Sequence, residues 1–489
     1  MGLGRACATI PDGTAKAMSI NPIPQDSLRR ALARLVSVYK PAPAVPLVTN
    51  DPAQLSALHR AWQIRVLVAA ILGYATFYLL RKNLSMAMPV MERDLGIAKS
   101  DLGLFLTLHG LLYGVSKLIN GVIGDHSHAR TFMVTGLVLS ALVNVCFGLS
   151  TGTLAFGVLW MLNGWFQGMG YPPCGRLMAH WIPPNELATK MSIWNASTNI
   201  GAGAVVIICG YLISAFGDWR LCFFAPASVA LVCALGLWFA LPDTPQSVGL
   251  PEVKGTQLKA TERTAADWKT ILVRHVLTNP WIWLLGIANF FIYSIRFAVL
   301  DWGPTFLSQQ KHLGLKHAGW IVAGYEISGM CGAMLGGWLT DRLFGGRCFR
   351  SCVFYMALTG VAVFIFWKVA GNSFGLNAAL LCVTGFFVYG PQCLLGIAAA
   401  NLATKRAAAS AVGLVGLFGY LSTTLSGWGL GKLVQTYGWD AGFAGMIIVA
   451  GLGTATCLIG WNAKPHGYEP ESAGATAPNR APHRAGAPD

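Results

Sequence analysis

Four cationic side chains stand inside long apolar stretches of the sequence. They are Arg81 and Lys82 in Tyr78-Leu-Leu-Arg-Lys-Asn, Lys117 in Tyr113-Gly-Val-Ser-Lys, and Arg296 in Tyr293-Ser-Ile-Arg-Phe. A charge at the middle of a lipid bilayer costs roughly 2.5–3.5 kcal/mol on insertion scales, so such residues usually face a cavity or a charged partner. The acids in comparable stretches are Asp301 and Glu326, both in the second half of the chain. The cations therefore outnumber the acids that could neutralise them.

This surplus of positive charge predicts a small anion as the ligand. Arg81 and Arg296 stand at corresponding positions of two similar halves, described below, so we expect them to reach one central site from opposite sides. A guanidinium stays charged at physiological pH, and its planar fork matches phosphate oxygens in pairs. A phosphate monoester carries about −1.5 to −2 charges near pH 7. A phosphate or a phosphate ester is therefore the favoured ligand, and a carboxylate is the competing one.

Tyrosines accompany the cations and could supply hydroxyls to a polar ester. Tyr74 and Tyr78 share one helical face with Arg81, and Tyr113 precedes Lys117 by one helical turn. Two more tyrosines, Tyr389 and Tyr420, stand in apolar runs of the second half. Packing or interfacial anchoring is the alternative for each of them.

The composition indicates a polytopic membrane protein. Of the 489 residues, 54% are hydrophobic and 11% are charged, whereas soluble domains carry about 25% charged residues. The net charge of +15 comes from Lys and Arg that gather in loops and tails on one face. That bias marks cytoplasmic loops and does not require nucleic acid. A soluble enzyme is excluded.

The sequence also lacks the patterns of other chemistry. Its twelve cysteines have no regular spacing, which predicts neither a disulfide framework nor a metal site. We find no nucleophile–base pair and no Gly-x-x-x-x-Gly-Lys loop for nucleotide phosphates. We therefore expect no enzymatic activity, no cofactor and no direct use of ATP.

Apolar windows of membrane-spanning length predict an all-α fold of twelve transmembrane helices. They lie at 64–89, 102–123, 131–150, 154–180, 190–215, 220–241, 281–307, 318–340, 350–370, 374–398, 407–435 and 440–461. The predicted organisation is an N-terminal segment (1–61), a six-helix bundle (62–241), a linker (242–280), a second six-helix bundle (281–461) and a tail (462–489). The even number of crossings and the distribution of Lys and Arg predict that both termini are cytoplasmic.

Four landmarks repeat between the halves. Arg81 corresponds to Arg296 and Asp125 to Asp341, while Pro172 in Gly-Tyr-Pro-Pro-Cys corresponds to Pro391 in Tyr-Gly-Pro-Gln-Cys and Trp219 to Trp439. The spacing between partners drifts only from 215 to 220 residues. This predicts a 6+6 duplication, the parallel-repeat architecture of the major facilitator superfamily, with the substrate between the halves near the middle of the membrane.

Two loop motifs resemble the signature of that superfamily. They are Gly-Val-Ile-Gly-Asp125-His-Ser-His-Ala-Arg130 and Gly-Trp-Leu-Thr-Asp341-Arg342-Leu-Phe-Gly-Gly-Arg. We expect these Asp and Arg residues to tie neighbouring helix ends together, in a structural or gating role. The first copy is incomplete because His126 stands where an Arg is usual.

Longer segments resemble the organophosphate:phosphate antiporter family from Tyr39 to about residue 461. They are Tyr78-Leu-Leu-Arg-Lys-Asn-Leu, Tyr113-Gly-Val-Ser-Lys, Gly164-Trp-Phe-Gln-Gly-Met-Gly-Tyr-Pro-Pro-Cys-Gly-Arg, Asp243-Thr-Pro-Gln-Ser-Val-Gly-Leu-Pro, Leu300-Asp-Trp-Gly-Pro-Thr and Gly416-Leu-Phe-Gly-Tyr. The Lys-Pro-Ala-Pro start and Asp-Trp-Gly-Pro-Thr are more similar to the glycerol-3-phosphate branch than to the hexose-phosphate branch.

The resemblance implies roles for individual residues. Arg81, Arg296 and Lys117 would bind the phosphoryl group. The tyrosines matching those that line the family's cavity are Tyr74, Tyr78, Tyr113, Tyr389 and Tyr420. A charged set that forms and breaks salt bridges during transport is matched by Lys82, Asp301 and Glu326.

One position departs from the family pattern. Related sequences read Trp-Asn-x-x-His-Asn in the fifth crossing, with the histidine at the phosphate site, whereas this chain has Thr198 followed by Asn199. A hydroxyl can donate a hydrogen bond but does not take up a proton near neutral pH as histidine does. The departure weakens both a proton-linked step at this position and the glycerol-3-phosphate assignment.

The resulting hypothesis is a transporter of the bacterial inner membrane. It would exchange an organophosphate, glycerol-3-phosphate being favoured, for inorganic phosphate by rocking of the two bundles. The alternatives are a hexose-phosphate or phosphoglycerate antiporter, or a transporter-like membrane sensor of a sugar phosphate. We expect a functional monomer in the lipid bilayer, with no nucleic-acid partner.

Overall fold

The computed structural model describes residues 37–253, 273–369, 371, 373–403 and 408–463. Within them, the regular elements are helices. Residues 1–40 form a unit of their own, and the helices below belong to the unit that starts at Pro41. Most of the predicted N-terminal segment and tail, and the middle of the predicted linker, lie outside the described residues.

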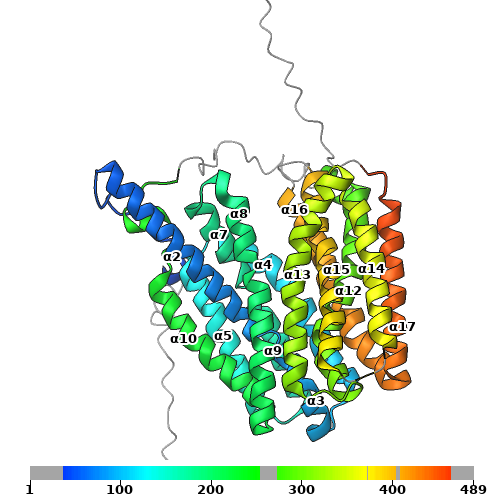
Figure 1. Ribbon diagram of the computed structural model, residues 1–489. Coiled ribbons are helices and arrows are strands. Elements are labelled where there is room, and N and C mark those ends of the chain that lie inside the picture. Colours follow the sequence, from blue (N-terminus) through cyan, green and yellow to red (C-terminus); the bar gives the residue numbers. More distant parts are fainter. Residues whose placement is uncertain (1–36, 254–272, 370, 372, 404–407, 464–489) are drawn as a thin grey trace, which may run out of the picture. The chain divides into compact units, whose positions relative to one another are not determined.

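The helices fall into an N-terminal half and a C-terminal half, labelled as in Figure 1. The N-terminal half contains α2 (Pro52–Leu79), α3 (Asn83–Leu95), α4 (Lys99–Asp125), α5 (Ala129–Leu149), α6 (Thr153–Gln167), α7 (Tyr171–Trp181), α8 (Pro184–Asn195), α9 (Ser197–Phe216) and α10 (Leu221–Ala240). The C-terminal half contains α12 (Pro280–Gln309), α13 (Leu315–Phe344), α14 (Cys348–Lys368), α15 (Phe374–Leu402), α16 (Ala408–Leu421) and α17 (Leu430–Ile459).

The membrane-spanning character of the fold is confirmed. Within the described residues, nine helical stretches are long and apolar enough to cross a bilayer. One of them, Ser410–Ile459, holds the eleventh and twelfth predicted crossings. The fourth and eighth predicted crossings correspond to α6 with α7 and to α13.

Several predicted crossings are interrupted where a single helix was expected. The first divides at residues 80–82, because the Arg81 and Lys82 amides both bond to the Tyr78 carbonyl and tighten the last turn of α2. The fourth divides at Gly-Met-Gly, 168–170, and the fifth divides at Ala196. The eleventh passes through a π-helix, Thr424–Gly429, and continues into α17. At 168–170 and at Ala196 the apolar windows do not reveal the breaks, because the interrupting residues are themselves small or apolar.

Local signals explain where the long helices begin and turn. Asp51 caps α2 by accepting a hydrogen bond from the Ala53 amide at 3.0 Å, ahead of Pro52 in the first turn. Asn279 caps α12 in the same way through the Trp281 amide at 3.0 Å. Gly438, with φ 81° and ψ 177°, allows the sharp kink inside α17 that separates the last two predicted crossings.

The halves contact each other at the end of the bundle that holds the loops after α3, α9 and α12. The Ser100 amide donates to Gln435 at 2.9 Å, and Gln309 donates to Glu92 at 2.8 Å. Trp320 of α13 donates to the Tyr211 hydroxyl of α9 at 3.4 Å. The described conformation is therefore closed at this end.

Glycines allow this close approach along two seams. In the α9–α13 seam, a Cβ on Gly319 would lie 2.5 Å from the Val206 carbonyl oxygen, and one on Gly210 would lie 2.8 Å from the Leu315 carbonyl oxygen. In the second seam, a Cβ on Gly103 of α4 would lie 2.4 Å from the Gly427 carbonyl oxygen. Because lipid removes most of the hydrophobic drive for helix association, such backbone contact is a main source of packing energy.

We expect Gly319→Ala to open the α9–α13 seam. Alanine favours a helix over glycine by about 1 kcal/mol, so the substitution by itself would stabilise α13. An opening of the seam would therefore come from the clash between the added Cβ and the Val206 carbonyl oxygen. The distance between spin labels at Phe216 and His317, which lie near the seam's end, should shift to a longer population. Gly236→Ala is the matched control, because a Cβ there meets nothing within 4 Å. An unchanged distance distribution in Gly319→Ala would contradict the prediction.

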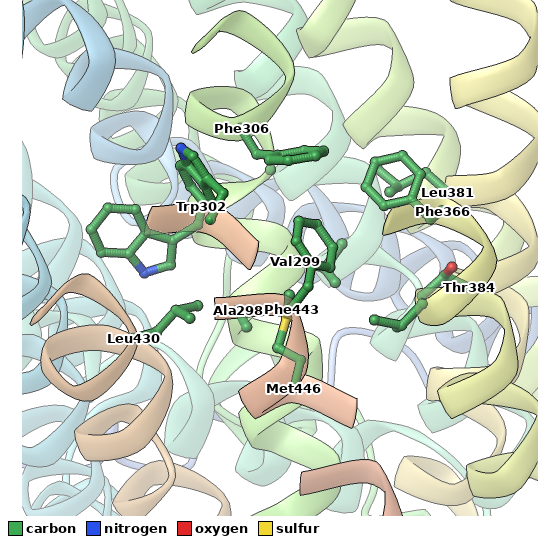
Figure 2. Close-up of a pocket in the computed structure, with 13 residues that line it drawn as sticks. Ala298, Val299, Trp302, Phe306, Phe366, Leu381, Thr384, Leu430, Phe443 and Met446 are labelled. Carbon is green, nitrogen blue, oxygen red and sulfur yellow. The ribbon is translucent and has the colours of Figure 1, made fainter. Parts of the chain in front are cut away.

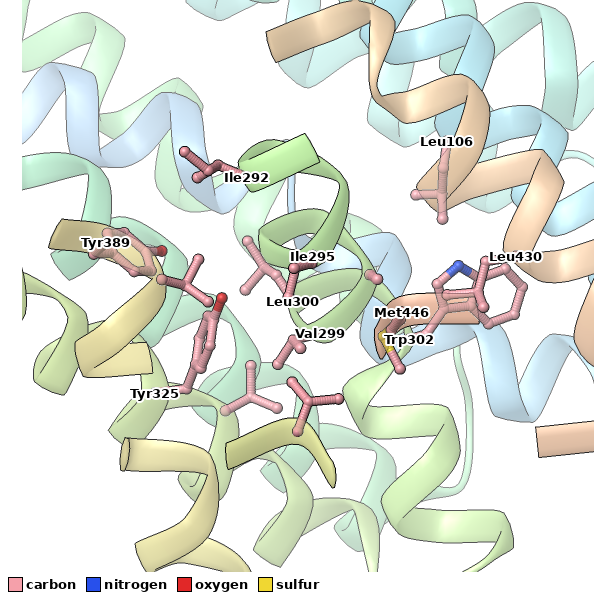
Figure 3. Packing of buried hydrophobic residues seen from close by; sticks show 14 of the residues in the cluster. Leu106, Ile292, Ile295, Val299, Leu300, Trp302, Tyr325, Tyr389, Leu430 and Met446 are labelled. Carbon is pink, nitrogen blue, oxygen red and sulfur yellow. The ribbon is translucent and has the colours of Figure 1, made fainter. Parts of the chain in front are cut away.

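The α12 helix lies at the centre of the C-terminal core. Figure 3 shows Ile295, Val299 and Leu300 of α12, with Tyr325 of α13 on one side of them and Met446 of α17 on the other. These side chains are buried. This packing holds the segment of α12 that carries Arg296 and Asp301.

Candidate functional site

Arg81 lies at the break between α2 and α3 and is surrounded by tyrosines. Its guanidinium carbon is 4.0 Å from the ring centre of Tyr113 and 4.6 Å from that of Tyr78. These are cation–π distances. The side chain is buried, and its Nη2 atom has no hydrogen-bond partner within the described residues. Arg81 therefore offers an unused charged donor at the interface between the halves.

Gln167, at the end of α6, is a site residue that the sequence did not single out. Its side-chain oxygen accepts a hydrogen bond from Arg81 Nε at 3.2 Å. The residue stands in the quoted Gly-Trp-Phe-Gln segment, but a neutral amide in an apolar stretch does not stand out as a charge does.

Arg296 occupies the corresponding place on α12. Its guanidinium carbon lies 4.5 Å from the ring centre of Tyr389 and 5.5 Å from that of Tyr293. The side chain is buried, and its Nε atom has no hydrogen-bond partner in the described part of the chain. Both arginines therefore combine a buried charge with an unused N–H group.

Aromatic contacts connect the two arginines across the interface. The rings of Tyr113 and Tyr420 lie 4.7 Å apart, and those of Tyr420 and Tyr293 lie 6.4 Å apart. Tyr78 contacts Arg81 on one side of the interface, and Tyr389 contacts Arg296 on the other. The structure thus brings predicted residues of both halves into one cluster.

Lys117 joins this cluster from α4. Its Nζ atom lies 5.8 Å from the ring centre of Tyr420 and 4.1 Å from that of Tyr171, which the sequence did not identify as a site residue. Among the described residues, neither arginine nor Lys117 forms an ion pair with an acid. The cluster therefore keeps the positive surplus that the sequence indicated.

Thr198 and Asn199 lie at the start of α9, where contacts to the other half begin. The Thr198 hydroxyl is 2.9 Å from the Asn195 carbonyl and 3.0 Å from the Asn199 side-chain oxygen. Asn199 donates to the Glu326 carboxylate at 2.9 Å, and Tyr389 donates to the same carboxylate. Thr198 is thus three contacts from the Tyr389–Arg296 pair, with its hydroxyl engaged within its own half.

The three predicted gating charges divide between two contacts. Lys82 and Asp301 form an ion pair of 2.6 Å that joins the halves, with both side chains under one-tenth exposed. Glu326 is held by hydrogen bonds from Asn199 and Tyr389 and takes no part in that pair. The Lys82–Asp301 pair and the Asn199–Glu326 hydrogen bond both cross the interface between the halves.

Tyr74 is a predicted tyrosine that packs into the N-terminal core. It packs against Trp194 at 4.8 Å and against Tyr78 at 5.6 Å. Its side chain is 3% exposed. In this conformation Tyr74 supports Tyr78, which itself contacts Arg81.

The loop-motif residues lie away from the cluster and make few ties. Arg130 donates to the Trp238 carbonyl of α10 at 3.3 Å, whereas Asp341 and Arg342 are exposed and Arg342 lies over Trp338 of its own helix. The side chain of Asp125 is not among those described. Within the described residues, Asp341 and Arg342 form no ion pair.

Asp243, from another quoted segment, ties these helix ends instead. Its carboxylate accepts hydrogen bonds from the Ala42 amide at 2.9 Å and the Ala129 amide at 3.0 Å, and it pairs with Arg176 at 3.2 Å. Arg176 also donates to the Ser127 carbonyl. Burial lowers the pKa of the neighbouring His128, so this imidazole is neutral at pH 7. Asp243 therefore joins four separate segments.

We expect Asp243→Asn to destabilise the protein strongly. The substitution replaces the carboxylate that faces Arg176 with a neutral amide, and the Asp243 side chain is fully buried. Breaking a buried ion pair in this way costs about 3–5 kcal/mol. Thermal unfolding in detergent should show a lower midpoint. Asp218→Asn, at a half-exposed pair of 3.9 Å, should leave the midpoint unchanged. Equal midpoints for the two variants would contradict this role.

A separate small pocket lies inside the C-terminal half. Figure 2 shows Ala298, Trp302 and Phe306 of α12 facing Phe443 of α17 and Thr384 of α15 across it. No charged side chain lines this pocket. It is therefore unsuited to an anion.

Comparisons with known proteins agree with this architecture. The family model described as Major Facilitator Superfamily matches residues 70–427. The glycerol-3-phosphate transporter of Bacillus subtilis (strain 168) is 37% identical over 88% of this chain and 98% of its own length. A probable hexose phosphate transport protein of Chlamydia pneumoniae is 37% identical over 85% and 94%. The membrane sensor protein UhpC of Escherichia coli (strain K12) is 36% identical over 86% and 98%.

Solved structures share the fold at lower identity. A bacterial homologue of the human lysosomal transporter Spinster, in an inward-facing and unoccupied conformation, superposes with a TM-score of 0.65. The match covers 82% of this chain and 95% of the homologue at 14% identity. With its family match, its helical fold and its organophosphate-transporter relatives, this chain belongs to the major facilitator superfamily, in the organophosphate:phosphate antiporter family that its motifs indicate.

Proposed function

We propose that this protein is a secondary active transporter that exchanges an organophosphate for inorganic phosphate. The carrying observation is the pair of buried arginines, one from each half, that present unused N–H groups within one aromatic cluster. Neither arginine has an acid within ion-pair distance in the described residues, and Glu326 is joined to Arg296 through Tyr389. The remaining positive charge favours a ligand of about two negative charges. Glycerol-3-phosphate is the favoured organophosphate, supported by the relative from Bacillus subtilis.

Exchange follows from the position of the charges between the halves. A phosphoryl group bound to Arg81 and Arg296 offsets the repulsion between them, so the loaded halves can rock past each other. The empty site keeps two uncompensated guanidiniums, which opposes the same movement. The transporter would therefore return only with another anion bound.

The closed end of the described conformation would face the periplasm. The Lys- and Arg-rich connections at the opposite end support a cytoplasmic location for that end and for both termini. We further propose that the protein acts as a monomer in the bacterial inner membrane and is closed toward the periplasm in this conformation.

A counterflow experiment tests the proposal. The full-length protein in liposomes loaded with phosphate should take up labelled phosphate from outside. Unlabelled glycerol-3-phosphate should compete more strongly than glucose-6-phosphate or phosphoglycerate. Competition led by one of the other esters would reassign the substrate, and the absence of counterflow would overturn the exchange function.

A sensor is the second candidate, because UhpC is also a relative of this chain. A sensor would bind a sugar phosphate without sustaining counterflow. Binding of glucose-6-phosphate, measured by calorimetry in the same liposome preparation, would then appear without uptake.

A further inference from the structure

The N-terminal half contains a buried network of neutral polar side chains beside Arg81. We call it the amide network; its members are Ser140, Asn144, Asn163 and Gln167, together with the carbonyl of Leu80. Each of the four side chains has no exposed area. Buried polar groups of this kind hold their geometry firmly because every broken hydrogen bond leaves an unsatisfied partner.

The network links both sides of the helix break to the guanidinium. Asn163 donates to the Leu80 carbonyl at 2.8 Å and accepts from the Ser140 hydroxyl at 2.5 Å. Gln167 donates to the Ser140 oxygen at 2.8 Å and accepts from Arg81 Nε at 3.2 Å. A continuous chain of hydrogen bonds therefore connects the Leu80 carbonyl, through Asn163, Ser140 and Gln167, to the side chain of Arg81.

Asn144 closes the network toward α3. It donates to the Ser140 carbonyl at 2.8 Å and to the Leu80 carbonyl at 3.4 Å, and it accepts from Asn83 at 2.8 Å. Asn83 begins α3 and also donates to the Cys222 carbonyl at 3.0 Å. The residues just before and just after Arg81 and Lys82 are thus both anchored.

The C-terminal half has apolar residues at two of the corresponding positions, whereas Thr359 corresponds to Ser140. The spacing of 215 that relates Arg81 to Arg296 places Ala298 opposite Asn83, and the spacing of 219 between α5 and α14 places Val363 opposite Asn144. Ala298 and Val363 both line the apolar pocket, and Thr384 of α15 lines it as well. A small pocket lined mainly by apolar side chains therefore lies beside α12, whereas hydrogen bonds lie behind Arg81 (Figure 2).

We propose that Ser140, Asn144 and Asn163 are positioning residues for Arg81, which they hold through Gln167 and Leu80. Arg81 is then the fixed arginine of the anion site, an assignment that rests on the proposed function, and Arg296 is the adjustable one. Arg296 Nε has no partner in the described residues, and the part of α12 that follows it borders the apolar pocket. The anion would meet a rigid donor on one half and a compliant donor on the other.

The first test measures the arginines without any ligand. The full chain, labelled with ¹⁵N-arginine in lipid nanodiscs, gives Nε–H signals that Arg81→Lys and Arg296→Lys assign by their loss. We expect Arg81 Nε–H to exchange with water at least about 10-fold more slowly than Arg296 Nε–H, because only the former is hydrogen-bonded. Ser140→Ala should remove this difference. Thr359→Ala, at the position corresponding to Ser140, should keep it, since Thr359 bonds only to its own helix at Tyr355.

Two results would overturn the proposal: equal exchange rates in the unmodified protein, or an unchanged Arg81 rate in Ser140→Ala. Should Ser140→Ala fail to fold, Gln167→Met removes the direct partner of Arg81 with a side chain of similar shape. It should accelerate Arg81 exchange to the same extent. An unchanged rate in Gln167→Met would overturn the proposal equally.

The second test connects positioning to transport. Ser140→Ala should raise the half-saturating phosphate concentration of counterflow about 10-fold with an unchanged maximal rate. Thr359→Ala should change neither value. Absence of counterflow in the unmodified protein would refute the proposed function alone, because the exchange rates still decide the positioning role. An unchanged half-saturating concentration in Ser140→Ala would refute the positioning role alone.

Discussion

Replacing Arg81 or Arg296 with lysine is expected to reduce phosphate counterflow at least about 100-fold. A guanidinium can give two parallel hydrogen bonds to one phosphoryl group, whereas an ammonium acts as a point charge. Loss of one or two charge-assisted hydrogen bonds costs about 3 kcal/mol in a buried site, which corresponds to the expected factor. Charge is conserved in both variants, so the loss would report on geometry.

The matched control for these variants is Arg93→Lys. Arg93 stands in the last turn of α3 with a side chain that is 70% exposed, and it contacts its neighbour Asp94. Counterflow by Arg93→Lys should equal that of the unmodified protein. Near-normal counterflow in Arg81→Lys or Arg296→Lys would exclude the model of two arginines on one phosphoryl group.

The charged residues of the site could be predicted from the sequence because their cost in a membrane makes them conspicuous. Arg81, Lys117 and Arg296 lie in one aromatic cluster, as the charge surplus and the repeated halves suggested. Their function as a phosphate site stays a prediction. The pairing of Lys82 with Asp301, and not with Glu326, could not be read from charge alone, because it depends on how far α3 and α12 overlap.

The neutral members of the site were not predictable in the same way. Gln167 and Asn163 cost less to bury than a charge once they are hydrogen-bonded, so nothing in the hydropathy of their segment separates them from packing residues. The helix break at 80–82 was also missed, since Leu80 continues the apolar run. The apolar windows locate helices in the bilayer but carry no information on where a helix is interrupted.

The loop motifs show what a local pattern leaves open. Arg130 ties α5 to α10 through the Trp238 carbonyl, Arg342 contacts Trp338 of its own helix, and further ties between helix ends come from Asp243. The structural or gating role of the motif residues stays a prediction. A motif match gives the kind of residue at a position, whereas the partner depends on which segments meet there. Asp243 meets Ala42, Ala129 and Arg176 because the chain after α10 lies against the starts of α2 and α5 and against α7, an arrangement that no local pattern records.

Replacing Asp301 with asparagine is expected to open the closed end of the protein and to reduce counterflow strongly. The change leaves Lys82 buried beside Phe297 without its partner at 2.6 Å, and an uncompensated buried charge costs about 3–5 kcal/mol. That cost applies to the closed conformation, because opening admits water to the lysine. A difference of this size shifts the population between the two conformations by roughly 100-fold or more.

Spin labels at Phe216 and His317 would measure this shift as a longer distance in Asp301→Asn. Asp94→Asn is the matched control, because the Arg93–Asp94 pair is exposed and such pairs contribute little.

The double variant Lys82→Met with Asp301→Leu should behave in the opposite way. Removing both charges also removes the cost of burying them, and apolar replacements of a buried pair are often neutral or stabilising. The double variant should therefore remain closed and exchange slowly.

These two variants distinguish a gate from a simple structural contact. If the ion pair only held the protein together, both variants would lower the thermal unfolding midpoint, and the label distance would follow unfolding. If the pair sets the balance between conformations, the single variant opens the α9–α13 end and the double variant closes it, while both remain folded. The same direction of shift in both variants would exclude Lys82 and Asp301 as the gate.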